Sequence, residues 1–147
     1  MQLKDFFISY TGKDKEWAVW IGQQLEDAGY SVILQDWDFG SGQNFVRNMD
    51  KASRNSRRTI AVLSPDYFKA TYTPAEWTAA FRQDPKGEKG TLLPVLVREC
   101  RKQLKGLFGP IAYIDLAGKD EVTARQRLID GVKGPQRPTT PPPFPGP

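Results

Sequence analysis

The chain has 147 residues, 39% of them hydrophobic and 12% aromatic, which is enough for one domain with a hydrophobic core. It contains no histidine and a single cysteine, so catalytic pairs built on histidine, histidine metal sites and an intrachain disulfide are excluded. The net charge of +4 resides in the segment 45–58, which holds five bases and one acid, and this is not the evenly basic chain typical of a nucleic-acid binder. No apolar run approaches the length of a membrane span and no signal segment opens the chain, so we expect a soluble, cytoplasmic protein without a membrane or nucleic-acid partner.

Five short apolar runs are predicted to form strands. They are continuous rather than alternating, which is typical of strands covered on both faces of a parallel sheet. Pro94 lies inside the fourth run and indicates a sheet edge or a strand start there. The predicted strands are Phe6–Ile8, Val32–Leu34, Ile60–Leu63, Leu92–Val97 and Ile111–Ile114.

Helical patterns separate these runs. Asp14 is expected to cap the first helix, which ends at Gly29. Ser64-Pro65 and Thr73-Pro74 each open a helix after the third run, and a loop is predicted between the fourth and fifth runs. A last helix begins near Asp120. The expected buried side chains are Trp17, Trp20, Ile21, Leu25 and Ala28 in the first helix, Phe45, Met49 and Ala52 in a helix after the second strand, Trp77, Ala80 and Phe81 after Thr73-Pro74, and Val122, Leu128, Ile129 and Val132 in the last.

The alternation of strands and helices predicts an α/β fold. Right-handed crossovers and short connections favour a flavodoxin-like, doubly wound, five-stranded parallel sheet in the order 2-1-3-4-5, with helices on both faces. In that order a ligand binds beyond the carboxyl ends of the first and third strands. The sequence therefore locates a candidate site at residues 9–12 and 64–66, with the loop after the second strand nearby.

Two nucleotide- and phosphate-based readings fail at this site. A phospho-receiver domain needs acids after the first strand and an aspartate after the third, whereas Ser9, Tyr10 and Ser64 stand there. The Gly40/Gly42 loop lacks the third glycine of a dinucleotide fingerprint and follows the wrong strand, and the chain has no phosphate loop of the Gly-Lys-Ser/Thr type.

The carboxylates are the remaining candidates for catalytic side chains. Asp36 and Asp38 follow the second strand, and Glu76 lies near the start of a predicted helix. The pattern Thr73–Glu76 matches a capping box, and local pattern alone favours a cap over catalysis. The predicted topology, however, lets Glu76 face the crevice, where a carboxylate beside aromatic rings can hold a planar heterocycle and stabilise an oxocarbenium-like ribose. The aromatic residues expected nearby are Tyr10, Trp37, Phe39, Tyr72 and Trp77.

Two further features have plain readings. Arg47, Lys51, Arg54 and Arg58 share one stripe of a predicted basic helix, which is a solvated face or, as the alternative, a surface for phosphates or an acidic protein. Cys100 follows a buried strand and is expected to be a packed or partly exposed thiol.

The segment Lys4–Tyr10 resembles the first box of Toll/interleukin-1 receptor (TIR) domains. The resemblance continues through Gly29–Asp36, the Gly40/Gly42 loop and Arg58–Pro65, and it covers about residues 3 to 133. Asp36-Trp37-Asp38 and Pro74-Ala75-Glu76-Trp77 are similar to bacterial TIR modules fused to other domains.

The resemblance implies the flavodoxin-like fold and an NAD+ glycohydrolase that cleaves the nicotinamide–ribose bond, some members forming cyclic ADP-ribose products. NAD+ is then the substrate, and no metal or cofactor is needed. Glu76 occupies the place of the catalytic glutamate, and Tyr72 stands where enzymatic members often carry Trp. The substrate-binding residues implied are Tyr10 and Thr11 on the nicotinamide side, Asp36, Trp37 and Phe39 at the crevice wall, and the aromatic Tyr72 and Trp77.

The resemblance also implies assembly. The loop Asp38, Gly40, Ser41, Gly42, Gln43 and Asn44 is similar to a loop that docks on a neighbouring TIR domain, so activity would be switched on by self-association into oligomers or filaments, in bacterial immune signalling and antiphage defence. The alternative is a non-catalytic TIR scaffold for homotypic assembly. Seven of the twelve prolines lie in residues 134–147, which we expect to be a linker or disordered tail after a domain of residues 1–133, with a further domain of the same protein beyond it.

Overall fold

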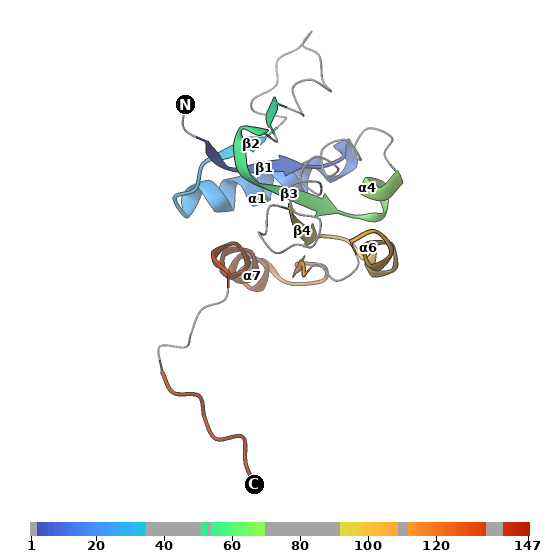
Figure 1. The fold of residues 1–147 in the computed structure, drawn as a ribbon. Coiled ribbons are helices and arrows are strands. Elements are labelled where there is room, and N and C mark those ends of the chain that lie inside the picture. The colour runs from blue at the N-terminus through green and yellow to red at the C-terminus, as the bar shows by residue number, and fades with distance from the viewer. Residues whose placement is uncertain (1–2, 35–50, 53, 70–91, 109–111, 135–139) are drawn as a thin grey trace.

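The fold is an α/β structure of one sheet between helices. The computed structural model describes residues 3–34, 51–52, 54–69, 92–108, 112–134 and 140–147. Its strands are β1 (Lys4–Ser9), β2 (Val32–Leu34), β3 (Ser56–Leu63), β4 (Leu92–Leu96) and β5 (Ile114–Asp115) (Figure 1). The helices are η1 (Gly12–Asp14), α1 (Lys15–Asp27), α4 (Pro65–Lys69), α6 (Arg101–Phe108) and α7 (Glu121–Lys133).

The sheet has the predicted order. Its strands run β2-β1-β3-β4-β5, and every neighbouring pair is parallel. The order reverses between β1 and β3, because the chain first moves outward to β2 and then returns to the other side of β1. At such a reversal, beyond the carboxyl ends of β1 and β3, doubly wound sheets bind their ligands.

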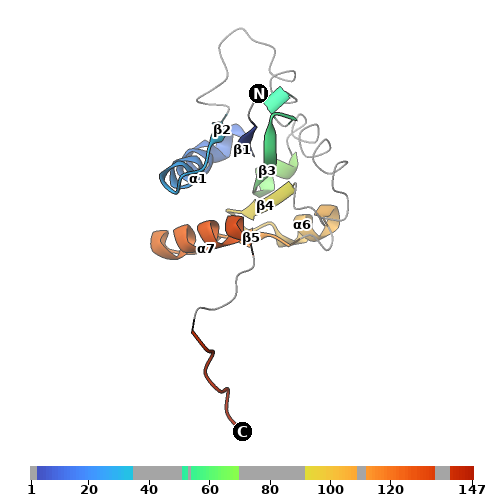
Figure 2. The ribbon, with the colours of Figure 1, turned by 60° about the vertical axis from the view of Figure 1, so that its left-hand side comes forward.

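Side chains of the strands alternate between two hydrophobic clusters, one on each face of the sheet. Ile60 and Val62 of β3 pack in the cluster that contains residues of α1 and α7. Ala61 and Leu63 pack instead in a cluster with Tyr67 of α4 and Leu104 of α6. Figure 2 shows α1 and α7 on one side of the strands and α4 and α6 on the other. Coverage of both faces explains why the strands read as continuous apolar runs.

Two helix ends match the sequence. Gly29 has a φ of +95°, the left-handed conformation that favours glycine just past a helix end. Asp120 caps α7 by accepting a hydrogen bond from the Thr123 N–H at 2.8 Å. Leu128 and Val132 of α7 are buried as predicted, and Gly131 lies so close to Ile114 of β5 that a Cβ there would overlap it.

Other expectations about the helices and strands are wrong. The segment predicted as a loop between the fourth and fifth strands contains α6, a helix with only one large apolar side chain, Leu104, that is described as buried. The fifth strand begins at Ile114 rather than at residue 111. Val122 is 73% exposed, because it lies in the first turn of α7 on the side away from the sheet, and Ala28 is exposed at the end of α1.

The basic stripe is not a single helical face. Arg54 is helical, but β3 begins at Ser56, so Arg58 lies on a strand. Its guanidinium lies 6.0 Å from the ring centroid of Phe6 and donates to the Val132 carbonyl at 3.2 Å. Burial lowers the pKa of this guanidinium. Arg58 therefore fastens β3 to the end of α7 and is not part of a surface with Lys51 and Arg54.

Pro94 lies within β4 and not at its start. It is aligned with Ala61 of β3, whereas the pairing of β4 with β5 begins at Val95. In the described residues, Pro94 therefore has a strand neighbour on one side, which fits the predicted edge and not the predicted strand start.

The chain beyond α7 carries no helix or strand in residues 140–147, and Phe144 there is 78% exposed. Gly134 ends α7 with a φ of +83°. Among the described residues, none of the helices has both the length and the apolar character that crossing a membrane would require.

Candidate functional site

The structure brings together the carboxyl ends of β1 and β3, where the sequence locates the candidate site. Ser9 ends β1 and Tyr67 lies in α4, directly after β3, and their hydroxyls form a hydrogen bond of 3.1 Å. Ser64, the first residue after β3, accepts a hydrogen bond from the Tyr67 N–H at 3.2 Å. These groups are all buried, so they form a polar layer inside the protein at the carboxyl ends of β1 and β3, called the polar layer below.

Asp14 lies at the centre of this layer. Its side chain is 1% exposed, and its Oδ2 accepts hydrogen bonds from the Thr11 hydroxyl at 3.2 Å and from the Ser64 hydroxyl. Its Oδ1 accepts from Nε of Arg98 at 2.9 Å. The prediction that Asp14 caps α1 is wrong in one respect: it occupies the N-cap position, but its side chain makes no cap hydrogen bond. The carboxylate bonds to the strand ends instead.

Arg98 links this buried carboxylate to α4. It follows β4, and its Nη2 lies 2.9 Å from Asp14 and 2.5 Å from Oδ2 of Asp66. Asp66 also lies 3.6 Å from Nζ of Lys13. The hydrogen bond from Arg98 is the main cause that lowers the pKa of Asp66, and the same bond raises the pKa of Arg98. Two bases and two acids thus form a chain of ion pairs without net charge, which runs from Lys13 through Asp66 and Arg98 to Asp14.

Tyr10 and Thr11 lie at the predicted site but are buried. The Tyr10 ring is 4% exposed and packs in the cluster beneath α1 and α7. The Thr11 side chain is 5% exposed, its hydroxyl donates to Asp14, and its carbonyl accepts from the Asp14 N–H at 2.9 Å. Their contact with a substrate stays a prediction, and in this conformation Thr11 holds the loop rather than offering its hydroxyl.

The remaining predicted site residues lie outside the described residues. These are the catalytic candidate Glu76, the substrate-binding candidates Asp36, Trp37, Phe39, Tyr72 and Trp77, and the assembly-loop residues Asp38, Gly40, Ser41, Gly42, Gln43 and Asn44. In the part of the chain that is described, no group of three or more Cys, Asp or Glu side chains could hold a metal ion.

Two residues of the polar layer were not singled out from the sequence. No local sequence pattern points to Arg98, because its partners Asp14 and Asp66 are 84 and 32 residues away in the chain. Tyr67 belongs to the layer through the hydrogen bond between its hydroxyl and that of Ser9, which is 58 residues away in the chain and so gives no local signal. Cys100, in contrast, is a packed thiol as expected, and burial raises its pKa to about 11.

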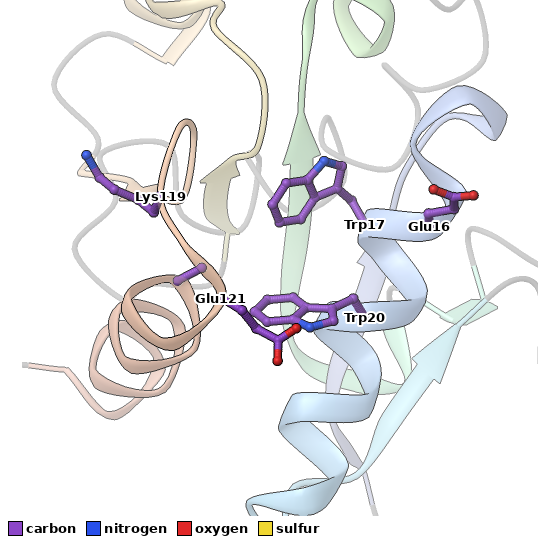
Figure 3. A pocket seen from close by; sticks show the side chains of 6 residues that line it. Glu16, Trp17, Trp20, Lys119 and Glu121 are labelled. Carbon is purple, nitrogen blue, oxygen red and sulfur yellow. The ribbon is translucent and has the colours of Figure 1, made fainter.

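A separate hollow of about 310 Å³ lies between α1 and α7. Figure 3 shows Trp17 and Trp20 projecting from α1 toward the start of α7, and their rings meet edge to face at 5.9 Å. Glu16, Lys119, Glu121 and Ala124 complete its lining. None of the predicted site residues lines it, and it lies on the face of the sheet opposite Tyr67.

The parallel sheet in the order β2-β1-β3-β4-β5, covered by helices on both faces, defines a flavodoxin-like fold. A sequence model of the TIR domain matches residues 6–129, so the chain belongs to the TIR domain family. In solved structures it is similar to the TIR domain of the Toll-related receptor TRR-2 of Hydra magnipapillata, with a TM-score of 0.70 and 27% identity over 89% of this chain and 99% of that one.

Two curated relatives are enzymes by name. The chain is 26% identical over 130 residues to the 2′ cyclic ADP-D-ribose synthase BtTIR of Bacteroides thetaiotaomicron, which is 88% of this chain and 45% of that protein. It is 30% identical over 114 residues to the NAD(+) hydrolase PdTIR of Paracoccus denitrificans, which is 77% of this chain and 38% of that protein. The chain therefore spans less than half the length of these relatives.

Proposed function

We propose that this TIR domain cleaves NAD+ at the nicotinamide–ribose bond, with Glu76 as the catalytic carboxylate. The observation that carries the proposal is the similarity to an NAD(+) hydrolase and a cyclic ADP-D-ribose synthase over 77% and 88% of this chain. The TIR domain model matches residues 6–129, which include the carboxyl ends of the neighbouring strands β1 and β3.

The chemistry suits a chain without histidine. Nicotinamide in NAD+ is a cationic leaving group, so it departs as a neutral molecule with the electron pair of the glycosidic bond and needs no general acid. The ribose becomes an oxocarbenium-like cation, which a single carboxylate can stabilise. Attack by water then gives ADP-ribose and a proton, whereas attack by a hydroxyl of the same molecule gives a cyclic product.

The proposed substrate contacts come from segments after β1, β2 and β3. Tyr10 and Thr11 follow β1, Asp36, Trp37 and Phe39 follow β2, and Tyr72 and Trp77 flank Glu76. Aromatic faces at such positions hold planar heterocycles by stacking. The reversal of strand order between β1 and β3 supports this placement, because it is the point at which doubly wound sheets bind ligands.

We further propose that the domain works in an assembly. Residues 38–44 would dock on a neighbouring TIR domain, and residues 134–147 would act as a tether from the domain of residues 1–133 to another part of the protein. The biological setting proposed is immune signalling in a bacterial cytoplasm.

The test is the substitution Glu76→Gln assayed with forced clustering of the chain on a multivalent support. Glutamine fits the third position of a capping box as well as glutamate does, so a cap would survive while the charge is lost. We expect nicotinamide release to fall by at least 100-fold, on the order of the loss of a principal electrostatic group. The matched control is Glu26→Gln on the exposed face of α1, which should keep the parent rate.

Three other outcomes would contradict the proposal. If the clustered Glu76→Gln protein still releases nicotinamide at the parent rate, Glu76 is not catalytic. If Glu76→Ala, which removes a capping side chain, loses thermal stability without a selective loss of activity, Glu76 is a helix cap. If the parent chain forms oligomers but releases no nicotinamide at any density, the domain is a scaffold.

A further inference from the structure

The candidate site is held by a connection between two segments that the proposed reaction uses. The loop after β1 supplies Thr11, and α4 begins the segment that reaches Glu76 seven residues after Lys69. Between them stands the chain of contacts from Asp14 through Arg98 to Asp66. Its two ends differ in burial: Asp14 is 1% exposed and Asp66 is 24% exposed.

The buried end has little freedom. Each oxygen of the Asp14 carboxylate is occupied, Oδ2 by two hydroxyls and Oδ1 by the guanidinium of Arg98. Asp14 also bonds the Thr11 carbonyl through its own N–H. A carboxylate that is buried and bonded in this way cannot shift without leaving charge or hydroxyls unpaired, so it fixes the position of the β1 loop.

The exposed end reaches the first turn of α4. The planar guanidinium of Arg98 contacts Asp14 and Asp66 at the same time, and this fork holds two carboxylates at a set separation, as an ammonium group could not. α4 has five residues, and in the described residues its anchors to the strand ends are the Ser9–Tyr67 bond, the Ser64–Tyr67 bond and the Arg98–Asp66 pair.

We propose that Arg98 and Asp66 are positioning residues: they hold α4, from whose end the chain continues toward Glu76, at a fixed position relative to the Thr11 loop. The proposal rests on the proposed NAD+ cleavage, because it assigns these residues a part in that reaction without contact to substrate. Both act through other groups, Arg98 through Asp14 and Asp66 through α4.

The structure offers a closely matched control. Asp115 is 20% exposed and lies 2.5 Å from Nη2 of Arg101, while Asp66 is 24% exposed and lies 2.5 Å from Nη2 of Arg98. Asp115 ends β5 and is bonded to the start of α6, away from the Thr11 loop. Asp66→Ala and Asp115→Ala each remove a short pair between a half-buried aspartate and an arginine, Asp66→Ala also the contact with Lys13 and Asp115→Ala also the bond from the Ala117 N–H, and only the first breaks the connection.

The experiment measures kcat and KM for NAD+ on the clustered full chain, and hydrogen exchange of residues 65–69 on the same proteins. We expect Asp66→Ala to lower kcat by about tenfold with KM changed less than about threefold, as for misplaced catalytic groups. Exchange in α4 should become faster. Asp115→Ala should leave kcat and exchange in α4 at the parent values. Arg98→Lys, which keeps the charge and loses the fork, should behave as Asp66→Ala does.

The two readouts separate the failure of this proposal from that of the proposed function. If exchange in α4 is the same in Asp66→Ala and in the parent, the connection does not hold α4 and the proposal is wrong. If exchange rises but kcat of an active protein is unchanged, or if Asp115→Ala loses as much kcat, the residues do not position the site. If the parent itself releases no nicotinamide, the NAD+ proposal fails, a role in that reaction fails with it, and exchange alone decides whether Arg98 and Asp66 hold α4.

Discussion

Arg98 and Arg101 stand three residues apart in the chain, and each guanidinium lies between two carboxylates. Arg98 contacts Asp14 and Asp66, and Arg101 contacts Glu99 and Asp115. The two arginines are equally exposed, at 42% and 40%. The clusters differ in one partner, because Asp14 is 1% exposed whereas Glu99 is 63% exposed.

This difference decides what each arginine does. In the Arg101 cluster every charged group can be solvated by water if the pairs break, and such exposed pairs contribute little to stability. In the Arg98 cluster Asp14 has no access to water, so its charge depends on Arg98, Thr11 and Ser64. An ion pair made by a partly exposed arginine can therefore contribute strongly to the stability of the fold when its carboxylate partner is buried.

The largest effect is expected for Arg98→Ala. It leaves the buried Asp14 carboxylate without its cation, and loss of one partner of a buried pair costs about 3–5 kcal/mol. The free energy of unfolding, measured by urea titration with circular dichroism, should fall by an amount in that range. The comparison fails if Arg101→Ala lowers the free energy of unfolding as much.

A smaller loss is expected for Ser64→Ala. It removes one of the two hydroxyls bonded to Oδ2 of the buried Asp14 carboxylate, whereas the Tyr67 N–H keeps its hydrogen bond to the Ser64 carbonyl at 3.1 Å. Leaving buried polar groups unsatisfied costs about 1–3 kcal/mol. The same urea titration tests it, and a loss equal to that of Arg98→Ala would mean that the hydroxyl matters as much as the cation.

The sheet and most of its helices could be predicted from sequence because their signals are local. Continuous apolar runs predict strands covered on both faces, and Gly29 and Asp120 mark helix ends whose geometry the structure confirms. The α6 helix was not predicted, because it opens on Arg101, Lys102 and Gln103, and polar residues after a strand are equally typical of a loop.

The polar layer could not be predicted, since its contacts join residues far apart in the chain. By local pattern Asp14 is predicted to cap a helix. In the structure its carboxylate instead accepts hydrogen bonds from Ser64 and Arg98, which are 50 and 84 residues away in the chain. Arg58 likewise fits a helical stripe by spacing, until pairing of β3 with β1 places it over Phe6. The assignment of Glu76 stays a prediction, because it lies outside the described residues.

The Arg98 cluster should also respond to acid. The bond from Arg98 lowers the pKa of Asp66 in the folded state below its value in the unfolded chain, so the ionised form stabilises the fold. This contribution is present above the unfolded pKa and is lost as the pH falls through the lowered folded pKa. In thermal melts, the parent should therefore lose more stability than Asp66→Asn on acidification below about pH 4. Parallel acid curves for the two proteins would show that the Arg98–Asp66 bond does not contribute.

The smallest effect is expected for Arg101→Ala, which removes contacts of Arg101 to Glu99 and Asp115 at the surface. Because all three groups reach water, their release costs little, and the unfolding midpoint should move by less than about 2 °C. Salt at about 1 M screens exposed charges beyond some 3 Å, so the residual difference from the parent should vanish in the same melts. Arg98→Ala should keep most of its loss under the same conditions, because salt does not enter the layer around Asp14. If high salt removed both losses equally, burial of Asp14 would not be what separates the two arginines.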